Sequence, residues 1–491
     1  MFAPHSYITY YRAEMTNFRL NLLSQDEIET IHESSIKILE TAGIRTMSHK
    51  ALDILRDAGA KVDYDKNHAT IPRAIVEEAL KRTSKTITYC ARNPRYDILL
   101  DKQSTYFITS GLDEPYILDW ETGERRLATC EDLVRWTRLA DYLENVHFLW
   151  VTLAASDAPP EIQSLTQLVI SLENTEKHVE YEAHNAKEAH YMIEIAETIM
   201  GDRDRLKQRP LISAVQSPLS PLVFEKGSIE AAIEFAQAGI PVVYMDMPLA
   251  MVTAPATLAG TLVLTNAENL SGLVISEFAS PGAPVVYSTC ASVVDPASGA
   301  PIESGMGNLL VHAAAQMAHY YDIPCELGGC GSMSKALDMQ AGYETAMGVN
   351  QNIFSGADII CGLGDLEAGL CASAAKLVID NEIVGEAYKF INNGLEITND
   401  TLALDVICKV GPGGNFLSEK HTLKHCRELI PPQLSDHSPF EVWRNKRYQS
   451  IDQVANQKVK EILAKHQPEP LPEHVERNIH EILNHAKREL S

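Results

Sequence analysis

The feature that most constrains the fold is a series of eight short apolar runs in the middle of the chain, each followed by a helix-like stretch. Strands that alternate with amphipathic helices are expected to pair in parallel, and eight such units close a (β/α)8 TIM barrel, an α/β fold whose chemistry sits at the C-terminal strand ends. The runs are Tyr106–Ser110, His147–Ala154, His178–Ala183, Pro210–Ser217, Pro241–Met247, Pro284–Cys290, Pro324–Cys330 and Ile359–Gly364.

The barrel leaves room for additions at both ends of the 491-residue chain. Residues 1–100 are predicted to form an N-terminal helical extension, because Ser24 and Glu27 resemble a capping box and Gly43 and Gly59 are natural helix stops. Residues 101–396 form the predicted barrel. Residues 397–491 form a glycine-rich closing segment and a helical tail, with helices expected near 451–466 and 473–489. The last of these helices follows a proline-rich connection and is expected to sit apart, against another subunit.

The charge balance excludes some partners. The chain has 42 basic and 66 acidic side chains, a formal net charge of −24, whereas nucleic acids and anionic membranes reward cationic surfaces. Nine cysteines without a CxxC pair, and no N-terminal signal pattern, indicate reduced thiols in the cytoplasm. No uninterrupted apolar stretch of about 20 residues is present, so no membrane span is predicted. A homo-oligomer is expected.

Aromatic residues are concentrated in the predicted strands. Rings that face one cavity can hold a quaternary ammonium by cation–π attraction, at roughly 0.5–2 kcal/mol per ring, although strands also bury aromatic residues for structural reasons. Glu326 lies within the apolar seventh strand, where a carboxylate is costly to bury unless it is paired. It could oppose a cation or form a structural salt bridge. Gln216, at the end of the fourth strand, is a weaker candidate of the same kind.

Cysteines near three neighbouring strands open a second possibility. Cys290, Cys330 and Cys361, with Glu326, could form a thiolate-rich zinc site, although free cysteine is also a common core residue. The glycine-dense segments 328–331 and 411–414 allow a large flat ligand to approach the backbone. They match neither a P-loop nor a dinucleotide-binding motif.

Several longer segments resemble signatures of the trimethylamine methyltransferase family of corrinoid-dependent enzymes, in the correct order over residues 20–445. They are Leu219–Leu222, Thr253–Gly260 with Asn266–Glu268, Pro281–Val285, Ser334–Glu344, Gly364–Gly369, Leu377–Ile383 and Gly411–Leu417 with His421-Thr422. The resemblance implies a barrel whose mouth receives the cobalamin of a separate corrinoid protein. The Co(I) centre would take a methyl group from an amine held in the barrel, so the amine, as a neutral leaving group, would need no prior protonation. No protein-bound metal is expected.

All 491 residues are standard amino acids, whereas founding members of that family carry pyrrolysine. The chain therefore resembles the non-pyrrolysine branch, which acts on betaines such as glycine betaine, proline betaine or carnitine. Many of those members place a His-Asp pair where this chain has Cys361-Gly362. The strand-end rings Tyr106, Trp150, Tyr181, Tyr244 and Tyr287 are the expected cage, and Glu326 and Gln216 the expected polar contacts. From position and motif match, Gly329, Gly331, Asp338, Gln340, Glu367, Gly413 and Gly414 are expected to face the corrinoid.

Two alternatives to this activity are open from sequence. One is a zinc-dependent methyltransferase that uses the three thiols. The other is a betaine-binding or sensing protein without catalysis, because pyrrolysine is missing.

Overall fold

A closed ring of eight parallel strands forms the centre of the computed structural model, which describes residues 19–302, 305–392, 396–426, 432–446 and 449–490. The strand order is β6-β19-β18-β15-β13-β11-β10-β9, and a parallel bridge between Ile108 and Phe148 joins the first strand to the last. The predicted (β/α)8 barrel is confirmed. Its strands are β6 (Tyr106–Thr109), β9 (Leu149–Trp150), β10 (Val179–Glu182), β11 (Ile212–Val215), β13 (Val242–Asp246), β15 (Val285–Thr289), β18 (Cys325–Leu327) and β19 (Ile359–Leu363).

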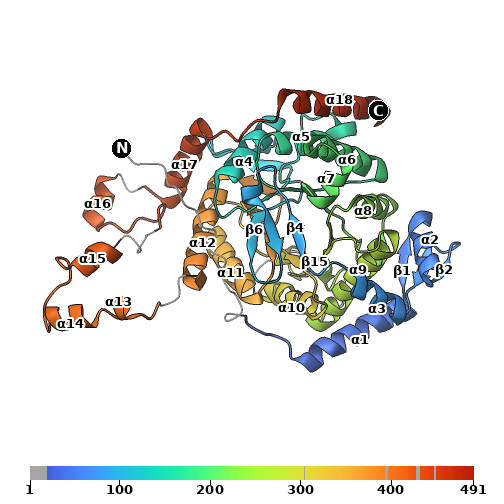
Figure 1. Ribbon diagram of the computed structural model, residues 1–491, viewed down its shortest axis with the longest axis horizontal. Coiled ribbons are helices and arrows are strands. Elements are labelled where there is room, and N and C mark those ends of the chain that lie inside the picture. Colours follow the sequence, from blue (N-terminus) through green and yellow to red (C-terminus); the bar gives the residue numbers. More distant parts are fainter. Residues whose placement is uncertain (1–18, 303–304, 393–395, 427–431, 447–448, 491) are drawn as a thin grey trace.

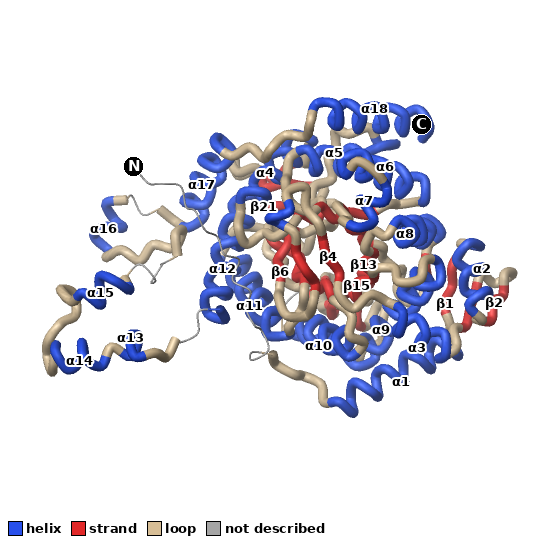
Figure 2. Tube along the Cα trace, viewed as in Figure 1, coloured by secondary structure: helices blue, strands red, loops and turns tan. Residues whose placement is uncertain are grey.

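Helices surround the strand ring on its outer side (Figures 1 and 2). They are α4 (Cys130–Tyr142), α5 (Gln163–Glu173), α6 (Ala186–Met200), α7 (Arg203–Gln208), α8 (Lys226–Ala238), α9 (Leu258–Ala279), α10 (Met306–Tyr320), α11 (Met339–Ser355) and α12 (Ala374–Asn392). Helix α9 is long and apolar enough to cross a membrane by length and composition, but 78% of its most apolar window is buried in the protein. Its buried residues include the polar side chains Asn266, Glu268 and Asn269, so α9 is a helix of the protein interior.

The N-terminal extension is not purely helical as predicted. It contains α1 (Gln25–Thr41), β1 (Ile44–Thr46), α2 (His49–Ala58), β2 (Lys61–Asp63), β3 (His68–Thr70), α3 (Arg73–Arg82), β4 (Ile87–Tyr89) and β5 (Ile98–Leu100). The capping box of Ser24 and Glu27 begins α1, and Gly59 ends α2 in a left-handed conformation, as expected. Three strands of only three residues each join β12 (Val223–Phe224) in a small sheet, and strands this short leave little periodicity in the sequence.

The hairpin β4–β5 closes the N-terminal end of the barrel, which we call the floor. Its residues Ile87, Tyr89, Ile98 and Leu100 belong to the same buried cluster as Phe148, Val215, Val243 and Val286 inside the strand ring. Tyr89 is fully buried and stacks on His178, with ring centroids 4.4 Å apart. The opposite end, at the C-terminal ends of the strands, is the mouth.

Short strands in the loops decorate the mouth: β7 (Tyr116–Leu118), β8 (Arg125–Leu127), β12, β14 (Leu249–Ala250), β16 (Ser292–Val294), β17 (Pro301–Ile302), β20 (Asp365–Leu366) and β21 (Cys371–Ser373). The predicted ribbon between the first two barrel strands is the antiparallel pair β7–β8. Single 3-10 turns lie at Pro94–Tyr96 and Pro160–Ile162.

The C-terminal part contains α13 (Asn399–Leu402), α14 (Leu404–Val410), α15 (Lys420–His425), α16 (Phe440–Asn445), α17 (Ile451–Lys465) and α18 (Glu473–Leu490). Both predicted tail helices are present as α17 and α18. The expectation that the last helix sits apart is wrong, because α18 buries Val475, Ile479 and Ala486 and lies beside α5 and α6 of its own chain (Figure 1). Helices α13 to α15 extend away from the barrel instead.

Candidate functional site

Alternation along the strands divides the barrel residues into two sets. In β10, Val179 and Tyr181 belong to the large cluster between strands and helices, so Glu180 points into the barrel. The same reasoning applies to Glu326 in β18, between Cys325 and Leu327. Glu326 lies opposite Ser288 of β15 and Ile359 of β19 in the strand register. The carboxyl groups of Glu180 and Glu326 therefore both point into the interior of the closed barrel.

Glu326 is 0% exposed, and neither of its carboxyl oxygens has a hydrogen-bond partner of good geometry among the described residues. Burial raises the pKa of Glu326 well above its ordinary value, and the nearby charge of Glu180 raises it further. Burial also raises the pKa of Glu180 to about 7. Two acids in one apolar enclosure cannot readily both ionise, so burial and their mutual repulsion favour the protonated form of Glu326.

A hydrogen-bond chain lies below Glu180. Burial lowers the pKa of His178 to about 4, so its ring is uncharged at neutral pH. Its Nδ1 lies 2.9 Å from the carbonyl oxygen of Cys90 and must carry the proton of that bond. The Ser213 hydroxyl lies 2.9 Å from Nε2 of His178 and donates to Oε2 of Glu180 over 2.6 Å. It therefore links the Glu180 carboxyl group to the uncharged His178 ring.

Further polar atoms in the barrel interior make no hydrogen bond of good geometry to the residues that the structure describes. They are the Tyr89 hydroxyl, the Trp150 indole N–H, Oε1 of Glu180 and the Ser288 hydroxyl. Buried polar groups in proteins are nearly always paired with protein, water or ligand. Their convergence with Glu326 marks a site for a polar or charged molecule, or for the water that it displaces.

Of the five predicted cage rings, only Trp150 lies in the upper barrel interior. Its face contacts Gly111, where an added Cβ would fall 1.8 Å from the indole ring. Tyr106 also faces inward, but at the floor, where its hydroxyl donates to the Leu99 carbonyl oxygen over 3.4 Å. Tyr89 of the floor hairpin was missed by sequence reasoning.

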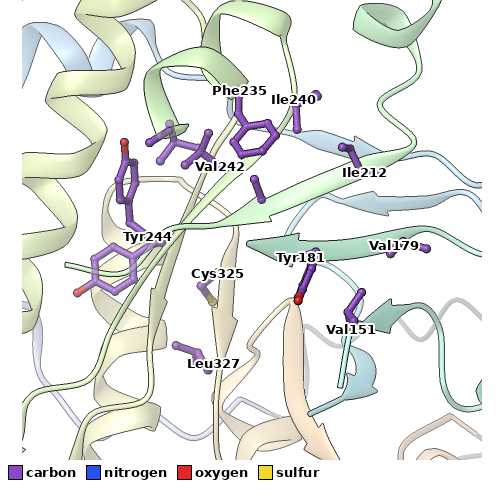
Figure 3. Packing of buried hydrophobic residues seen from close by; sticks show 14 of the residues in the cluster. Val151, Val179, Tyr181, Ile212, Phe235, Ile240, Val242, Tyr244, Cys325 and Leu327 are labelled. Atoms are coloured by element: carbon purple, nitrogen blue, oxygen red, sulfur yellow. The ribbon is translucent and has the colours of Figure 1, made fainter. Parts of the chain in front are cut away.

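The expectation that Tyr181, Tyr244 and Tyr287 face a shared cavity is wrong. They occupy the outward positions of their strands and belong to the cluster beneath the helices, of which Figure 3 shows Tyr181 and Tyr244. The Tyr244 hydroxyl lies 2.7 Å from Ser276 Oγ of α9, and that of Tyr287 donates to Asn266 of the same helix over 3.4 Å. That of Tyr181 donates to Asp113 over 3.0 Å. Both faces of a barrel strand are buried, so aromatic content alone does not reveal the inner one.

Gln216 also turns away from the barrel interior. It lies one position beyond the inward residue Val215, and its Oε1 accepts a 2.9 Å hydrogen bond from Ser228 of α8. Its Nε2 is buried without a partner among the described residues. Glu180, found by the structure, carries the same sequence signal as Glu326: a carboxylate inside an otherwise apolar strand.

The residues expected to face the corrinoid divide into three groups. Asp338 caps α11 by accepting from the N–H groups of Gln340 and Ala341, and Gln340 donates to Glu344 over 3.0 Å. Glu367 forms a two-point ion pair with Arg125, with contacts of 2.8 and 2.9 Å, on the ribbon side of the mouth. The third group contains the glycines Gly329, Gly331, Gly413 and Gly414, which lie in two different parts of the structure.

Gly329 and Gly331 lie directly after β18 at the mouth. Gly329 has a φ of +115°, and a Cβ there would meet Asn352 and Asn308, so the glycine is required by packing. Gly331 is buried, with its N–H against Gly362. Gly413 and Gly414 lie between α14 and α15, outside the barrel, and do not join the others.

Three groups of side chains bring metal-ligating atoms within 4.8 Å of one another in the described parts of the chain, and none of them contains the three thiols named above. Asp113, Glu182 and His184 form the group at the mouth, above Glu180 on the same strand. Burial and the nearby Asp113 raise the pKa of Glu182 to about 7, and a hydrogen bond to Glu188 raises that of His184 to about 9. Cys330 packs in the outer cluster, whereas Cys290 and Cys361 lie in the inner one.

A pH test follows from the raised pKa of Glu180. A carboxyl group whose pKa rises from 4.5 to about 7 on folding stabilises the protein fully below pH 4.5 and loses that contribution as the pH rises through 7. The glutamine side chain does not titrate in this pH range. We therefore expect the melting temperature of Glu180→Gln, relative to wild type, to increase between about pH 5 and about pH 8. A difference that stays constant across this range would show that Glu180 is already ionised in the folded protein.

Comparison with known proteins places this barrel in a family. The profile of the trimethylamine methyltransferase (MTTB) family matches residues 5–491. Trimethylamine methyltransferase MttB of Desulfitobacterium hafniense is 33% identical over 97% of this chain and 96% of its own length. Glycine betaine methyltransferase of the same species is 33% identical over 96% of this chain and 98% of its own. The chain belongs to the trimethylamine methyltransferase family, and it is accordingly a methyltransferase.

A solved structure supports the fold. The crystal structure of the Methanosarcina barkeri monomethylamine methyltransferase (MtmB) superposes with a TM-score of 0.53 at 12% identity, covering 96% of this chain and 88% of that one.

Proposed function

We propose that the protein takes a methyl group from a quaternary amine of the betaine class and passes it to the Co(I) centre of a separate corrinoid protein in the cytoplasm. The observation that carries the proposal is the pair Glu180 and Glu326, buried without cationic partners on the inner face of the barrel. Family membership supplies the reaction class, and the 33% identity with a glycine betaine methyltransferase favours the quaternary substrate.

The acid pair suits a permanent cation. When a quaternary ammonium enters, its charge stabilises a carboxylate on Glu326 or Glu180, and one proton leaves to solvent. The Trp150 indole contributes cation–π attraction of roughly 0.5–2 kcal/mol in such a setting. A tertiary ammonium can lose its own proton to solvent and enter as a neutral amine, which leaves no charge for the carboxylate to oppose, so the acids favour a quaternary amine.

The methyl transfer itself requires little acid–base catalysis by the protein. The corrinoid, when bound, supplies the nucleophile that attacks the methyl carbon in line with the C–N bond. The nitrogen keeps the electron pair of that bond and leaves as a neutral tertiary amine. The barrel residues must therefore align the amine and exclude water. Excessive stabilisation of the cation by Glu326 would slow the reaction, because the positive charge disperses as the bond breaks.

The mouth fits a large flat partner surface. Exposed apolar side chains from successive strand-to-helix loops and from the first turns of α10 and α11 surround it: Leu219, Met247, Met251, Val252, Met306, Leu309, Met339 and Leu370. Large apolar patches on a soluble protein mark interaction sites. Of the residues expected to face the corrinoid, we retain Gly329, Gly331, Asp338, Gln340 and Glu367, which lie in the loops after β18 and β19 or, for Gln340, in the first turn of α11.

The decisive experiment is a spectroscopic screen. Purified protein is mixed with cob(I)alamin and, in turn, with glycine betaine, proline betaine, carnitine, tetramethylammonium and trimethylamine, while the absorbance change of the corrinoid on methylation is followed. We expect methylation with at least one quaternary amine and none with trimethylamine. Tight betaine binding without methylation, even with a cognate corrinoid protein, would instead support a sensing function.

A further inference from the structure

The segment 396–426, which we call the arm, leaves the barrel and has no buried residue (Figures 1 and 2). It contains α13, α14 and α15, which have 4, 7 and 6 residues. Isolated helices this short are unstable in water. Their ion pairs join arm residues to one another, as with Lys409 and Glu419 at 2.7 Å. The arm therefore has secondary structure without a core to support it.

Large apolar side chains on the arm face solvent. They are Ile397, Leu402, Leu404, Ile407, Phe416, Leu417 and Leu423, with exposed fractions from 42% to 87%. Monomeric proteins rarely expose contiguous apolar surface of this extent. The arm needs a covering surface.

The barrel of the same chain carries an apolar groove beside α11 and α12. It has a volume of about 410 Å³ and is lined by Ala346 and Asn350 of α11, by Ile379, Ile383, Ala387 and Phe390 of α12, and by Ser435 and Ile451 of the C-terminal part, with Glu382 and Glu386 at its edge. Phe390 is 68% exposed. Met339, Tyr343 and Met347, spaced four residues apart, continue the apolar surface along α11 towards the mouth and are also exposed.

The position of the arm argues against the corrinoid protein as its partner. Helix α12 begins beside the mouth, after β21, and ends at the floor, where Tyr388 donates to the carbonyl oxygen of Thr105 just before β6. The arm starts directly beyond this floor end. A protein that presents a corrin to the mouth of the same chain approaches from the opposite side of the barrel.

Charge favours a second copy of this chain. The chain as a whole has a net charge of −24, whereas the arm has four acidic and three basic side chains. The arm is thus the part that can approach another strongly acidic copy with little repulsion. Two equivalent contacts related by a two-fold axis, each with an arm in the groove of the other copy, cover the apolar side chains of both arms and both grooves.

We propose that the arm of one copy binds the α11–α12 groove of a second copy, and the reverse, in a reciprocal dimer contact. Seven large apolar side chains from each arm, placed on the groove and the α11 surface, supply an interface on the scale of the about 800 Å² per partner that stable complexes bury. This inference does not depend on the proposed substrate.

Sedimentation of the full chain tests the proposal. Wild type is expected at twice its 54.3 kDa mass or a higher even multiple. Ile407→Glu on the arm and Phe390→Glu in the groove are each expected to halve the sedimenting mass, which gives the monomer where wild type is a dimer, with an unchanged circular dichroism spectrum. Met47→Glu, at a similarly exposed position (59%) directly after β1, is the matched control and should keep the wild-type mass. A monomeric wild type, or an Ile407→Glu protein of wild-type mass, would overturn the proposal.

Cross-linking identifies the surface that the arm occupies. Cys408 is exposed on α14, so Asn350→Cys in the groove gives it a partner for a short bismaleimide. We expect a covalent dimer from this variant and none from Met47→Cys. A cross-link formed within one chain, which leaves the monomer mass in denaturing gels, would show that the arm folds onto its own barrel and would contradict the contact between copies.

Discussion

Glu326→Gln is expected to lower the rate of methyl transfer by at least about tenfold while leaving the barrel folded, a loss of about 1.4 kcal/mol or more. Glutamine keeps the size of the side chain but cannot become negative, so a quaternary ammonium would enter the enclosure without an opposing charge. The rate of corrinoid methylation and the betaine dissociation constant would both be measured. Because the charge acts mainly on the bound cation, weaker binding should account for much of the effect.

Glu277→Gln is the matched control for that experiment. Glu277 is also 0% exposed, but it lies on α9 and accepts from the N–H of Gly282, away from the barrel interior. We expect its substitution to leave the rate of methyl transfer unchanged. Wild-type rate and betaine affinity in the Glu326→Gln protein would remove Glu326 from the site.

Lys376→Met is expected to destabilise the protein by about 3–5 kcal/mol, because it leaves a buried charge without its partner. Lys376 and Asp380 on α12 are each 1% exposed and form an ion pair at 2.7 Å. Asp380 also accepts from the N–H of Gly364, where β19 turns into the mouth. Urea denaturation followed by circular dichroism measures the loss.

The double variant Lys376→Met, Asp380→Leu provides the control for this prediction. Replacing both members of a buried ion pair by apolar residues is often nearly neutral, so we expect most of the stability to return. A loss below about 1 kcal/mol in the single variant would mean that Asp380 is solvated or already protonated.

The sequence allowed the barrel to be predicted because all eight apolar runs correspond to strands, in order. The direction of individual side chains could not be predicted, since both faces of these strands are buried. Tyr244 and Tyr287 appear as strand-end aromatics in sequence, yet they bond to α9 behind the sheet. A carboxylate within an apolar strand indicates a site in the barrel interior better than an aromatic ring does, because few buried positions tolerate a carboxylate.

Two further parts of the site escaped prediction for different reasons. Tyr89 comes from a hairpin whose strands have only three residues each, too short for a periodic signal, and it reaches His178 from a distant part of the chain. The segment containing Gly413 and Gly414 resembles a family signature, and such a likeness does not tell where the segment lies in space. The structure places it on the arm.

The β4–β5 hairpin has a kinetic consequence. Since its residues Tyr89 and Leu100 are fully buried against the strand ring, small molecules must use the same opening that the corrinoid would cover. The amine then has to enter first and the demethylated product has to wait until the corrinoid departs. Initial-velocity measurements should accordingly show compulsory-order kinetics, in which excess corrinoid protein traps the free enzyme and inhibits turnover.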